Sequence, residues 1–349
     1  MNSNYNELAG KVVAGCELIR ELGRGTNGIV YLAKQQNLNR LVACKIISGD
    51  LQDDPDFMDN LFTEAANAAK LSHPNIIQAL NAGSDDSGLK YFMMEYVEGT
   101  SLETIRLESP EKISTKFLLN ISLQLASAMD YVWQQHQMIH GDIKPGNLLV
   151  ASEGNILKIG DLGLARSSNG VSDPDDVMIT PLYAAPEIIS QSATGPSQQS
   201  DIYSFGVMFY ELACGKAPFT GSIEEILQGH LSAAPVPLIV MNPDFDRELS
   251  QFIDSMLAKD PAMRPADWKS VYRKLQEIRS RLLSGTPLPP EPPKPSTPAA
   301  RASRQTSWSA EKKTNNKIMA KFPWLLPALL IIVILGALLS IPFSMGLFK

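Results

Sequence analysis

The chain has 349 residues and a formal net charge of −6, with 44% hydrophobic and 19% charged residues. This composition excludes a largely disordered chain, and the length suits one two-lobed unit with appendages. The acidic balance argues against a general nucleic-acid binder, so no nucleic-acid partner is expected.

The three cysteines, Cys16, Cys44 and Cys214, are scattered along the chain. Because they form no CxxC pair, they indicate neither a disulfide framework nor a zinc site, which favours the reducing cytosol. The first fifteen residues hold no apolar stretch of the length that an export signal needs. The N-terminal part is therefore expected to stay in the cytoplasm.

The first part of the chain, about 15–96, is rich in β-favouring runs. These runs lie at 28–33, 41–47 and 89–97, and an amphipathic helix is predicted over 56–71. This part predicts a small sheet lobe.

The pattern turns helical over about 97–283. Apolar residues recur at helical spacing in 117–133 and 248–260, and short strands are predicted near 147–150 and 157–160. The second part therefore predicts a larger α lobe, and the fold class is α+β.

A proline-rich, basic linker is predicted over 284–321, where prolines favour an extended chain. The segment that follows, 322–348, has 27 residues without a charge. About 20 apolar helical residues cross a hydrocarbon core of ~30 Å. A transmembrane helix is therefore predicted over 322–345.

Basic residues flank this predicted span unequally. Only Lys349 follows it, whereas the lysines just before it are Lys312, Lys313, Lys317 and Lys321. Such an excess places the N-terminal side of a span in the cytoplasm. We therefore expect a single-pass protein with a C-terminal anchor in the membrane lipid bilayer.

A glycine-rich sequence, GxGxxGxV, lies between two β-favouring runs. Its defining residues are Gly23, Arg24, Gly25, Gly28 and Val30. Glycines let a hairpin backbone approach phosphate oxygens that a Cβ would obstruct. A dinucleotide-binding loop shares the spacing, but a helix follows the loop in that fold and a strand follows here.

Lys45 lies in an apolar strand, directly after Ala43 and Cys44. A charge in such a strand is costly unless it is paired. Glu64 on the predicted helix is a candidate partner, which would leave Lys45 donors for the phosphates of a nucleotide. The alternative for Glu64 is a solvated helix face.

Two further motifs carry a more specific signal, HGDIKPGN at 140–147 and DLG at 161–163. They resemble the catalytic loop and the metal-binding motif of protein kinases. In their order and spacing, the motifs over about 15–283 resemble those of bacterial eukaryotic-like serine/threonine protein kinases.

This resemblance implies the bilobal protein kinase fold, with ATP and Mg2+ as cofactors. Asp142 would orient the substrate hydroxyl and accept its proton, and Lys144 would neutralise the γ-phosphate. Asn147 and Asp161 would hold the metal. The implied ATP-binding residues, with Met94 as gatekeeper and Glu95 and Val97 in the hinge, are Gly23, Arg24, Gly25, Gly28, Val30, Ala43, Lys45, Glu64, Met94, Glu95, Val97 and Asn147.

The resemblance also implies protein substrates. Lys144 and Thr180 match serine/threonine rather than tyrosine kinases, and Glu187, in an APE motif, would pair with Arg264. Asp201 resembles the buried aspartate that holds the catalytic loop. The implied function is transfer of the γ-phosphate of ATP to Ser or Thr of proteins, including autophosphorylation in a possible homodimer.

One departure from the family pattern is Gly141, where an arginine usually receives an activation-loop phosphate. We therefore expect activity not to depend on phosphorylation of Ser167, Ser168 or Ser172. The HGD tripeptide also resembles small-molecule kinases of the same fold. A catalytically inactive scaffold is a further alternative, since a fold does not guarantee chemistry.

Overall fold

The computed structural model describes residues 8–25, 28–49, 55–161, 166–167, 180–191 and 195–285. The chain divides into two units, Met1–Pro289 and Pro290–Lys349, and all described residues belong to the first. The predicted membrane span, and the predicted linker beyond 285, lie outside the described residues. Within the described part, no helix combines the length and the apolar character needed to cross a bilayer.

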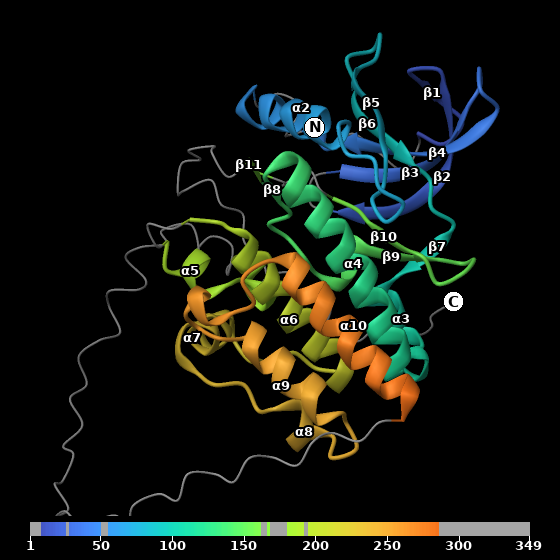
Figure 1. Ribbon diagram of the computed structural model, residues 1–349. Coiled ribbons are helices and arrows are strands. Elements are labelled where there is room, and N and C mark those ends of the chain that lie inside the picture. The colour runs from blue at the N-terminus through green and yellow to red at the C-terminus, as the bar shows by residue number, and fades with distance from the viewer. Residues whose placement is uncertain are drawn as a thin grey trace, which may run out of the picture. The chain divides into compact units, whose positions relative to one another are not determined.

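The N-terminal lobe is built on one antiparallel sheet of six strands (Figure 1). In spatial order they are β1 (Val12–Val13), β2 (Cys16–Gly25), β3 (Gly28–Gln35), β4 (Arg40–Ile47), β6 (Lys90–Glu95) and β5 (Ala79–Ser84). Strands β3, β4 and β6 confirm the predicted runs. The sequence does not predict β5, because its residues ALNAGS have low β propensity and main-chain pairing with β6 supports it.

Inward-facing side chains of this sheet form the core of the lobe. Leu18, Tyr31 and Cys44 are buried there together with Leu8 and Val13. The packed lobe thus begins several residues before 15. Helix α2 (Pro55–Ala68) contacts β5 and ends before the predicted limit at 71.

Helices make up most of the C-terminal lobe (Figure 1). They are α3 (Leu102–Glu108), α4 (Thr115–His136), α5 (Pro186–Ile189), α6 (Gln198–Cys214), α7 (Ile223–Ser232), α8 (Leu238–Met241), α9 (Arg247–Met256) and α10 (Trp268–Ser284). Side chains of Ser114 and Asp246 accept backbone N–H groups at the starts of α4 and α9. These two helices confirm the predicted helical segments.

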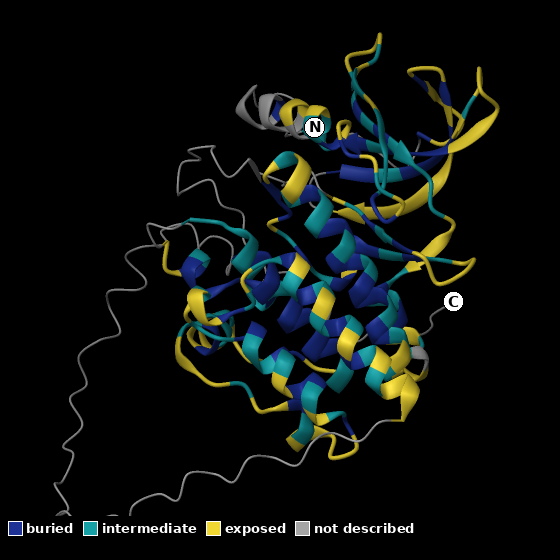
Figure 2. Cartoon of the chain, in the orientation of Figure 1, coloured by how far each residue is buried: buried dark blue, intermediate teal, exposed yellow. Residues whose placement is uncertain are grey.

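Helices α4 and α6 lie at the centre of this lobe. Helix α6 buries every residue from Ser200 to Leu212 except Ser204 (Figure 2). Helix α10 packs along α4, and the fully buried Trp268 at its start lies against Phe205. Burial on nearly all sides makes α6 a rigid base for the loops that it supports.

Two small sheets carry the loops near the junction of the lobes. One consists of β7 (Gly99–Ser101), β9 (Leu148–Ala151) and β10 (Leu157–Ile159), and the other of β8 (Met138–Ile139) and β11 (Arg166–Ser167). Strands β9 and β10 confirm the predictions near 147–150 and 157–160.

The junction itself is joined through β10. Ile159 bridges Ile76, which precedes β5. The Asn75 side-chain amide donates to Gln124 Oε1 at 2.7 Å and to the Leu157 carbonyl at 2.8 Å. These buried or half-buried bonds tie the segment before β5 to α4 and β10.

Candidate active site

Four residues of the predicted nucleotide site share one face of the N-terminal sheet. Val30 pairs with Lys45 across β3 and β4, and Ala43 pairs with Met94 across β4 and β6. Ala43 and Lys45 are two residues apart on one strand and therefore point to the same side as their partners. Phe92, opposite Lys45, lies on this face as well and was not indicated by the sequence.

The glycines between β2 and β3 serve different purposes. A Cβ at Gly23 or Gly25 would meet nothing within 4 Å, which leaves space for a phosphate beside the backbone. Gly28 has φ +150°, and a Cβ there would lie 2.0 Å from the Ile46 carbonyl oxygen. Glycine at 28 is therefore required by the close approach of β4 rather than by a ligand.

Two cations of the predicted site have acidic neighbours. Lys45 Nζ lies 3.8 Å from Asp161 Oδ1, and Arg24 pairs with Glu21 at 3.0 Å. Glu64 is located on α2, but its side chain is outside the described residues, so the Lys45–Glu64 pair stays a prediction. In the described part, the acidic partner of Lys45 is the predicted metal ligand Asp161.

The predicted hinge is braced by an ion pair. Glu95 Oε1 lies 2.6 Å from Lys158 Nζ on β10, and the Glu95 N–H donates to the Gln78 carbonyl at 2.9 Å. The Glu95 N–H is thus engaged within the protein. Val97, the other predicted hinge residue, is half-buried two positions after the end of β6.

Asp201 at the start of α6 holds the catalytic loop backbone. Its two carboxylate oxygens accept the N–H groups of His140 and Gly141 at 2.7 and 2.8 Å. Burial raises the pKa of Asp201, and the two donors oppose that rise. Gly141 has φ +81°, a left-handed conformation that suits glycine. The role predicted for Asp201 is confirmed.

Three side chains surround the carboxylate of Asp142. Thr180 Oγ1 donates to Oδ1 at 2.7 Å, while Asn147 Nδ2 donates to Oδ2 at 3.0 Å. Lys144 Nζ lies 2.6 Å from the same Oδ2 and donates to Thr180 Oγ1 at 3.2 Å. All these partners are donors, so together they fix the direction of the carboxylate.

Asn147 and Asp161 have the chemistry of a hard-cation site. The Asn147 amide nitrogen faces Asp142, donating to its carbonyl and carboxylate, so the amide oxygen points the other way. Asp161 adds a largely exposed carboxylate on a residue with φ +47°, a conformation that is uncommon for aspartate. One amide and one carboxylate oxygen fit Mg2+, which takes its other ligands from phosphates and water.

Within the described ranges, no cluster of three or more His, Cys, Asp and Glu side chains could hold a metal ion.

The segment from Thr180 to Tyr183 is held at several points beside Asp142. The Tyr183 carbonyl accepts Ser204 Oγ at 2.8 Å, and its hydroxyl donates to Glu211 Oε2. Arg106 Nε lies 3.6 Å from the other oxygen of Glu211. Burial raises the pKa of Glu211, whereas the tyrosine hydroxyl and the guanidinium oppose that rise.

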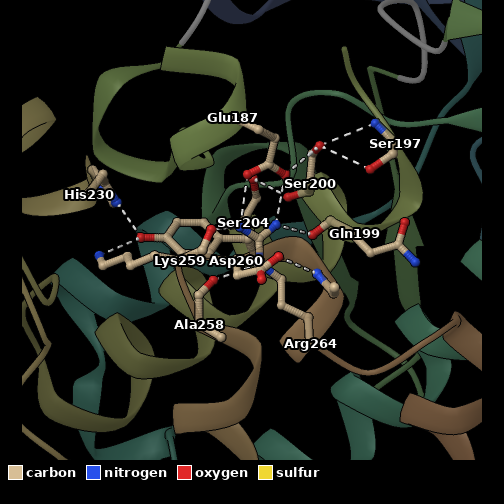
Figure 3. A network of polar contacts seen from close by, with 12 residues as sticks. Glu187, Ser197, Gln199, Ser200, Ser204, His230, Ala258, Lys259, Asp260 and Arg264 are labelled. Atoms are coloured by element: carbon tan, nitrogen blue, oxygen red, sulfur yellow. Dashed lines mark hydrogen bonds and ion pairs between the residues drawn. The ribbon is translucent and has the colours of Figure 1, made fainter. Parts of the chain in front are cut away.

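The predicted Glu187–Arg264 pair is present and buried (Figure 3). The guanidinium makes a two-pronged contact with Glu187 at 2.7 and 2.8 Å. Arg264 also donates to the main-chain carbonyls of Gln199, Ala258 and Lys259. This network joins the start of α5 to α6 and to the loop after α9.

Sequence reasoning missed the contacts of Lys158, Glu211 and His230. Each is a titratable residue inside an apolar run, namely LKIG, VMFYEL and ILQGHL. A polar group in such a run requires a partner when it is buried, and this is the signal that points to all three. The partner itself cannot be read from the run.

Residues 16–275 match the family described as "Protein kinase domain". The chain belongs to the protein kinase family.

Its relatives include named bacterial kinases. It is 32% identical to serine/threonine-protein kinase PrkC of Bacillus subtilis in an alignment of 362 positions, gaps included. The alignment covers 98% of this chain and 55% of the relative. It is 33% identical to serine/threonine-protein kinase PknB of Mycolicibacterium smegmatis over 277 residues, covering 76% and 42%. The chain thus spans about half the length of these curated relatives.

Solved structures support the same fold. A crystal structure of the PknI kinase domain of Mycobacterium tuberculosis has a TM-score of 0.62 at 23% identity, covering 78% of this chain and 98% of that chain. A likeness at this identity shows the fold alone. It confirms the predicted bilobal kinase fold.

Proposed function

We propose that the chain is a serine/threonine protein kinase that transfers the γ-phosphate of ATP to Ser or Thr hydroxyls of proteins, including its own. The main observation in support is the cluster at Asp142, whose carboxylate is held by Asn147, Lys144 and Thr180. This carboxylate already accepts a threonine hydroxyl. A substrate hydroxyl presents the same chemistry.

In the proposed reaction, the substrate oxygen forms a bond to the γ-phosphorus as the bond from that phosphorus to the ADP oxygen breaks. Asp142 orients the attacking hydroxyl and takes up its proton. Lys144, 2.6 Å from Asp142, brings a positive charge toward the transferred phosphoryl group. Mg2+, held by Asn147 and Asp161, would neutralise charge on the phosphates.

Several observations support a protein rather than a small-molecule substrate. The segment 180–187 is anchored at both ends, by Asp142 at Thr180 and by Arg264 at Glu187. An ordered segment that starts beside the catalytic carboxylate offers a surface for an extended peptide. A scaffold without activity would not need a carboxylate oriented by three donors.

We further propose that the predicted span 322–345 tethers this kinase to a membrane, with its kinase domain cytoplasmic. The support is the 27-residue uncharged stretch and the excess of lysines before it. Confinement to two dimensions would raise the local concentration of copies and favour autophosphorylation within a homodimer.

Transfer of labelled γ-phosphate to a generic protein tests the proposed activity. The full chain is compared with Asp142→Asn and with Asp254→Asn, the same chemical change on α9 outside the site. We expect Asp142→Asn to lower transfer by about 10²- to 10⁴-fold, as for loss of a general base, and Asp254→Asn to retain it. Melting temperatures of both variants show whether folding is intact.

Undiminished transfer by a folded Asp142→Asn chain would rule out the proposed role of this residue. Nucleotide binding without transfer to protein would favour the scaffold, and transfer only to small hydroxyl compounds would favour the small-molecule kinase.

A further inference from the structure

A series of hydrogen bonds reaches the Thr180–Tyr183 segment from helix α7 and the loop after α9. Lys259 Nζ donates to Tyr203 Oη at 3.4 Å, and this oxygen lies 2.9 Å from His230 Nδ1 (Figure 3). His230 Nε2 lies 3.0 Å from the Leu182 carbonyl oxygen. These hydrogen bonds thus join the loop after α9, helix α6 and helix α7 to Leu182, two positions after Thr180.

The chemistry of the end groups sets the direction of every bond in this series. A carbonyl oxygen can only accept, so Nε2 of His230 carries the proton. Nδ1 of the neutral ring must then accept, and the Tyr203 hydroxyl donates to it. The hydroxyl oxygen is left to accept from the ammonium of Lys259.

Burial keeps this histidine neutral and in one place. His230 is 0% exposed, and burial lowers its pKa to about 4, with the charge of Lys259 acting in the same direction. Phe219 packs on the histidine ring at 5.0 Å between centroids. A Cβ at Gly229 would lie 2.7 Å from Phe219, so the aromatic ring packs directly against the backbone of α7.

The position of Leu182 gives the contact its consequence. Thr180 bonds Asp142, and the carbonyl and hydroxyl of Tyr183 are bonded to Ser204 and Glu211 on α6. His230 supplies the tie from α7 to the same short segment. Loss of this bond would leave the half-buried Leu182 carbonyl without its His230 donor.

We propose that His230 and Tyr203 are positioning residues for the protein substrate, because they fix the Leu182 carbonyl and with it the segment beside Asp142 on which a peptide would lie. This inference rests on the proposed kinase function. It adds to that function a support for substrate binding that lies outside the nucleotide and metal residues.

Three substitutions separate the hydrogen-bond chain from simple packing. Tyr203→Phe removes the hydroxyl and keeps the ring, while His230→Leu removes both ring nitrogens. His230→Gln retains an N–H donor for Leu182 and an oxygen acceptor for Tyr203. Ser250→Ala is the matched control, since it deletes a buried hydroxyl that serves the Ile239 N–H between α8 and α9.

Steady-state kinetics of the full chain then compare KM for a protein substrate with KM for ATP. We expect His230→Leu and Tyr203→Phe to raise the protein KM about three- to tenfold, the size of one lost hydrogen bond, with the ATP KM unchanged within about twofold. His230→Gln should restore most of the protein KM. Ser250→Ala should lower the melting temperature without separating the two KM values.

Hydrogen exchange of the amides in 180–189 gives a second measurement that needs no activity. Exchange should be faster in His230→Leu and Tyr203→Phe than in the unsubstituted chain, and unchanged in His230→Gln and Ser250→Ala. An unchanged protein KM with unchanged exchange would overturn the inference, as would equal rises of both KM values. If His230→Leu and Tyr203→Phe exchange faster but the unsubstituted protein phosphorylates no protein substrate, the proposed function is overturned. The structural role of the His230–Leu182 hydrogen bond would still stand.

Discussion

Gly25 ends β2 and Gly28 begins β3, yet the structure demands glycine at only one of these two positions on steric grounds. The Gly28 backbone has φ +150°, and its missing Cβ makes room for the Ile46 carbonyl. Gly25 faces open space. The glycine motif therefore combines one position that serves the sheet with others that suit a phosphate.

Alanine substitutions at Gly25 and Gly28 should therefore differ in their effect on the free energy of unfolding. Gly28→Ala should destabilise the protein by about 1–3 kcal/mol, because β3 and β4 must move apart to admit a methyl group. Gly25→Ala should change the free energy of unfolding by less than about 1 kcal/mol. Urea denaturation measures both, and equal stabilities of the two variants would contradict the assigned roles.

A second prediction at the residue scale concerns pH. The pKa of His230 is about 4 in the folded protein, against 6.5 for an exposed histidine in an unfolded chain. Because the folded pKa is the lower one, the unfolded chain binds the proton more readily, and stability is lost as pH falls from 6.5 toward 4. At pH 5 the loss relative to pH 7.5 is about 2 kcal/mol.

Urea denaturation at pH 7.5 and pH 5 checks this value. The His230→Gln variant lacks the titrating ring and should lose about 2 kcal/mol less over the same interval. The other titrating groups affect both chains alike, so parallel losses in the two proteins would show that His230 does not titrate as inferred.

At the scale of elements, β10 connects the parts of the candidate site. Lys158 on this strand holds Glu95 of the predicted hinge, Ile159 bridges the segment before β5, and Asp161 follows two residues later. One short strand therefore sets the separation between hinge and predicted metal ligand.

We expect the Lys158–Glu95 ion pair to couple stability with nucleotide binding. In a double-mutant cycle with Lys158→Met and Glu95→Gln, the coupling energy of unfolding should be about 0.5–1 kcal/mol, because the pair is only partly buried. Each single variant should also raise the KM for ATP, and the reversed pair Lys158→Glu with Glu95→Lys should recover part of it. A coupling energy near zero would show that the Lys158–Glu95 ion pair does not stabilise the protein.

At the scale of the whole molecule, the chain divides after Pro289, and the described residues all precede this division. The candidate active site, the segment 180–187 and the hydrogen bonds that connect it to His230 belong to the first unit. Transfer activity is thus expected to reside there, and membrane attachment in the second.

Flotation with phospholipid vesicles tests this division of labour. We expect the full chain to float with the vesicles, because the uncharged stretch at 322–348 is long enough to span a bilayer. The fragment 1–289 should remain in the dense fraction while retaining phosphate transfer. A full chain that stays in the dense fraction with the fragment would contradict the proposed membrane tether.

The sequence alone predicted the strands β3, β4 and β6, the order of the motifs and the residues expected to carry the chemistry. The strands and the motif order follow from residue type and spacing over short distances, where periodicity acts directly. The roles of the residues expected to carry the chemistry came with the family resemblance. The pairing of Glu187 with Arg264 and the role of Asp201 came with the family resemblance, and the structure confirms both.

For the other buried and half-buried polar groups, only the tertiary structure decided which partners they take. Tyr183 bonds Glu211, His230 bonds Leu182 and Lys158 pairs with Glu95, across 28, 48 and 63 positions of sequence. A sequence shows that a polar group inside an apolar run needs a partner. The choice among distant candidates is made by packing of the helices and strands that carry them, and it exists only in the folded chain.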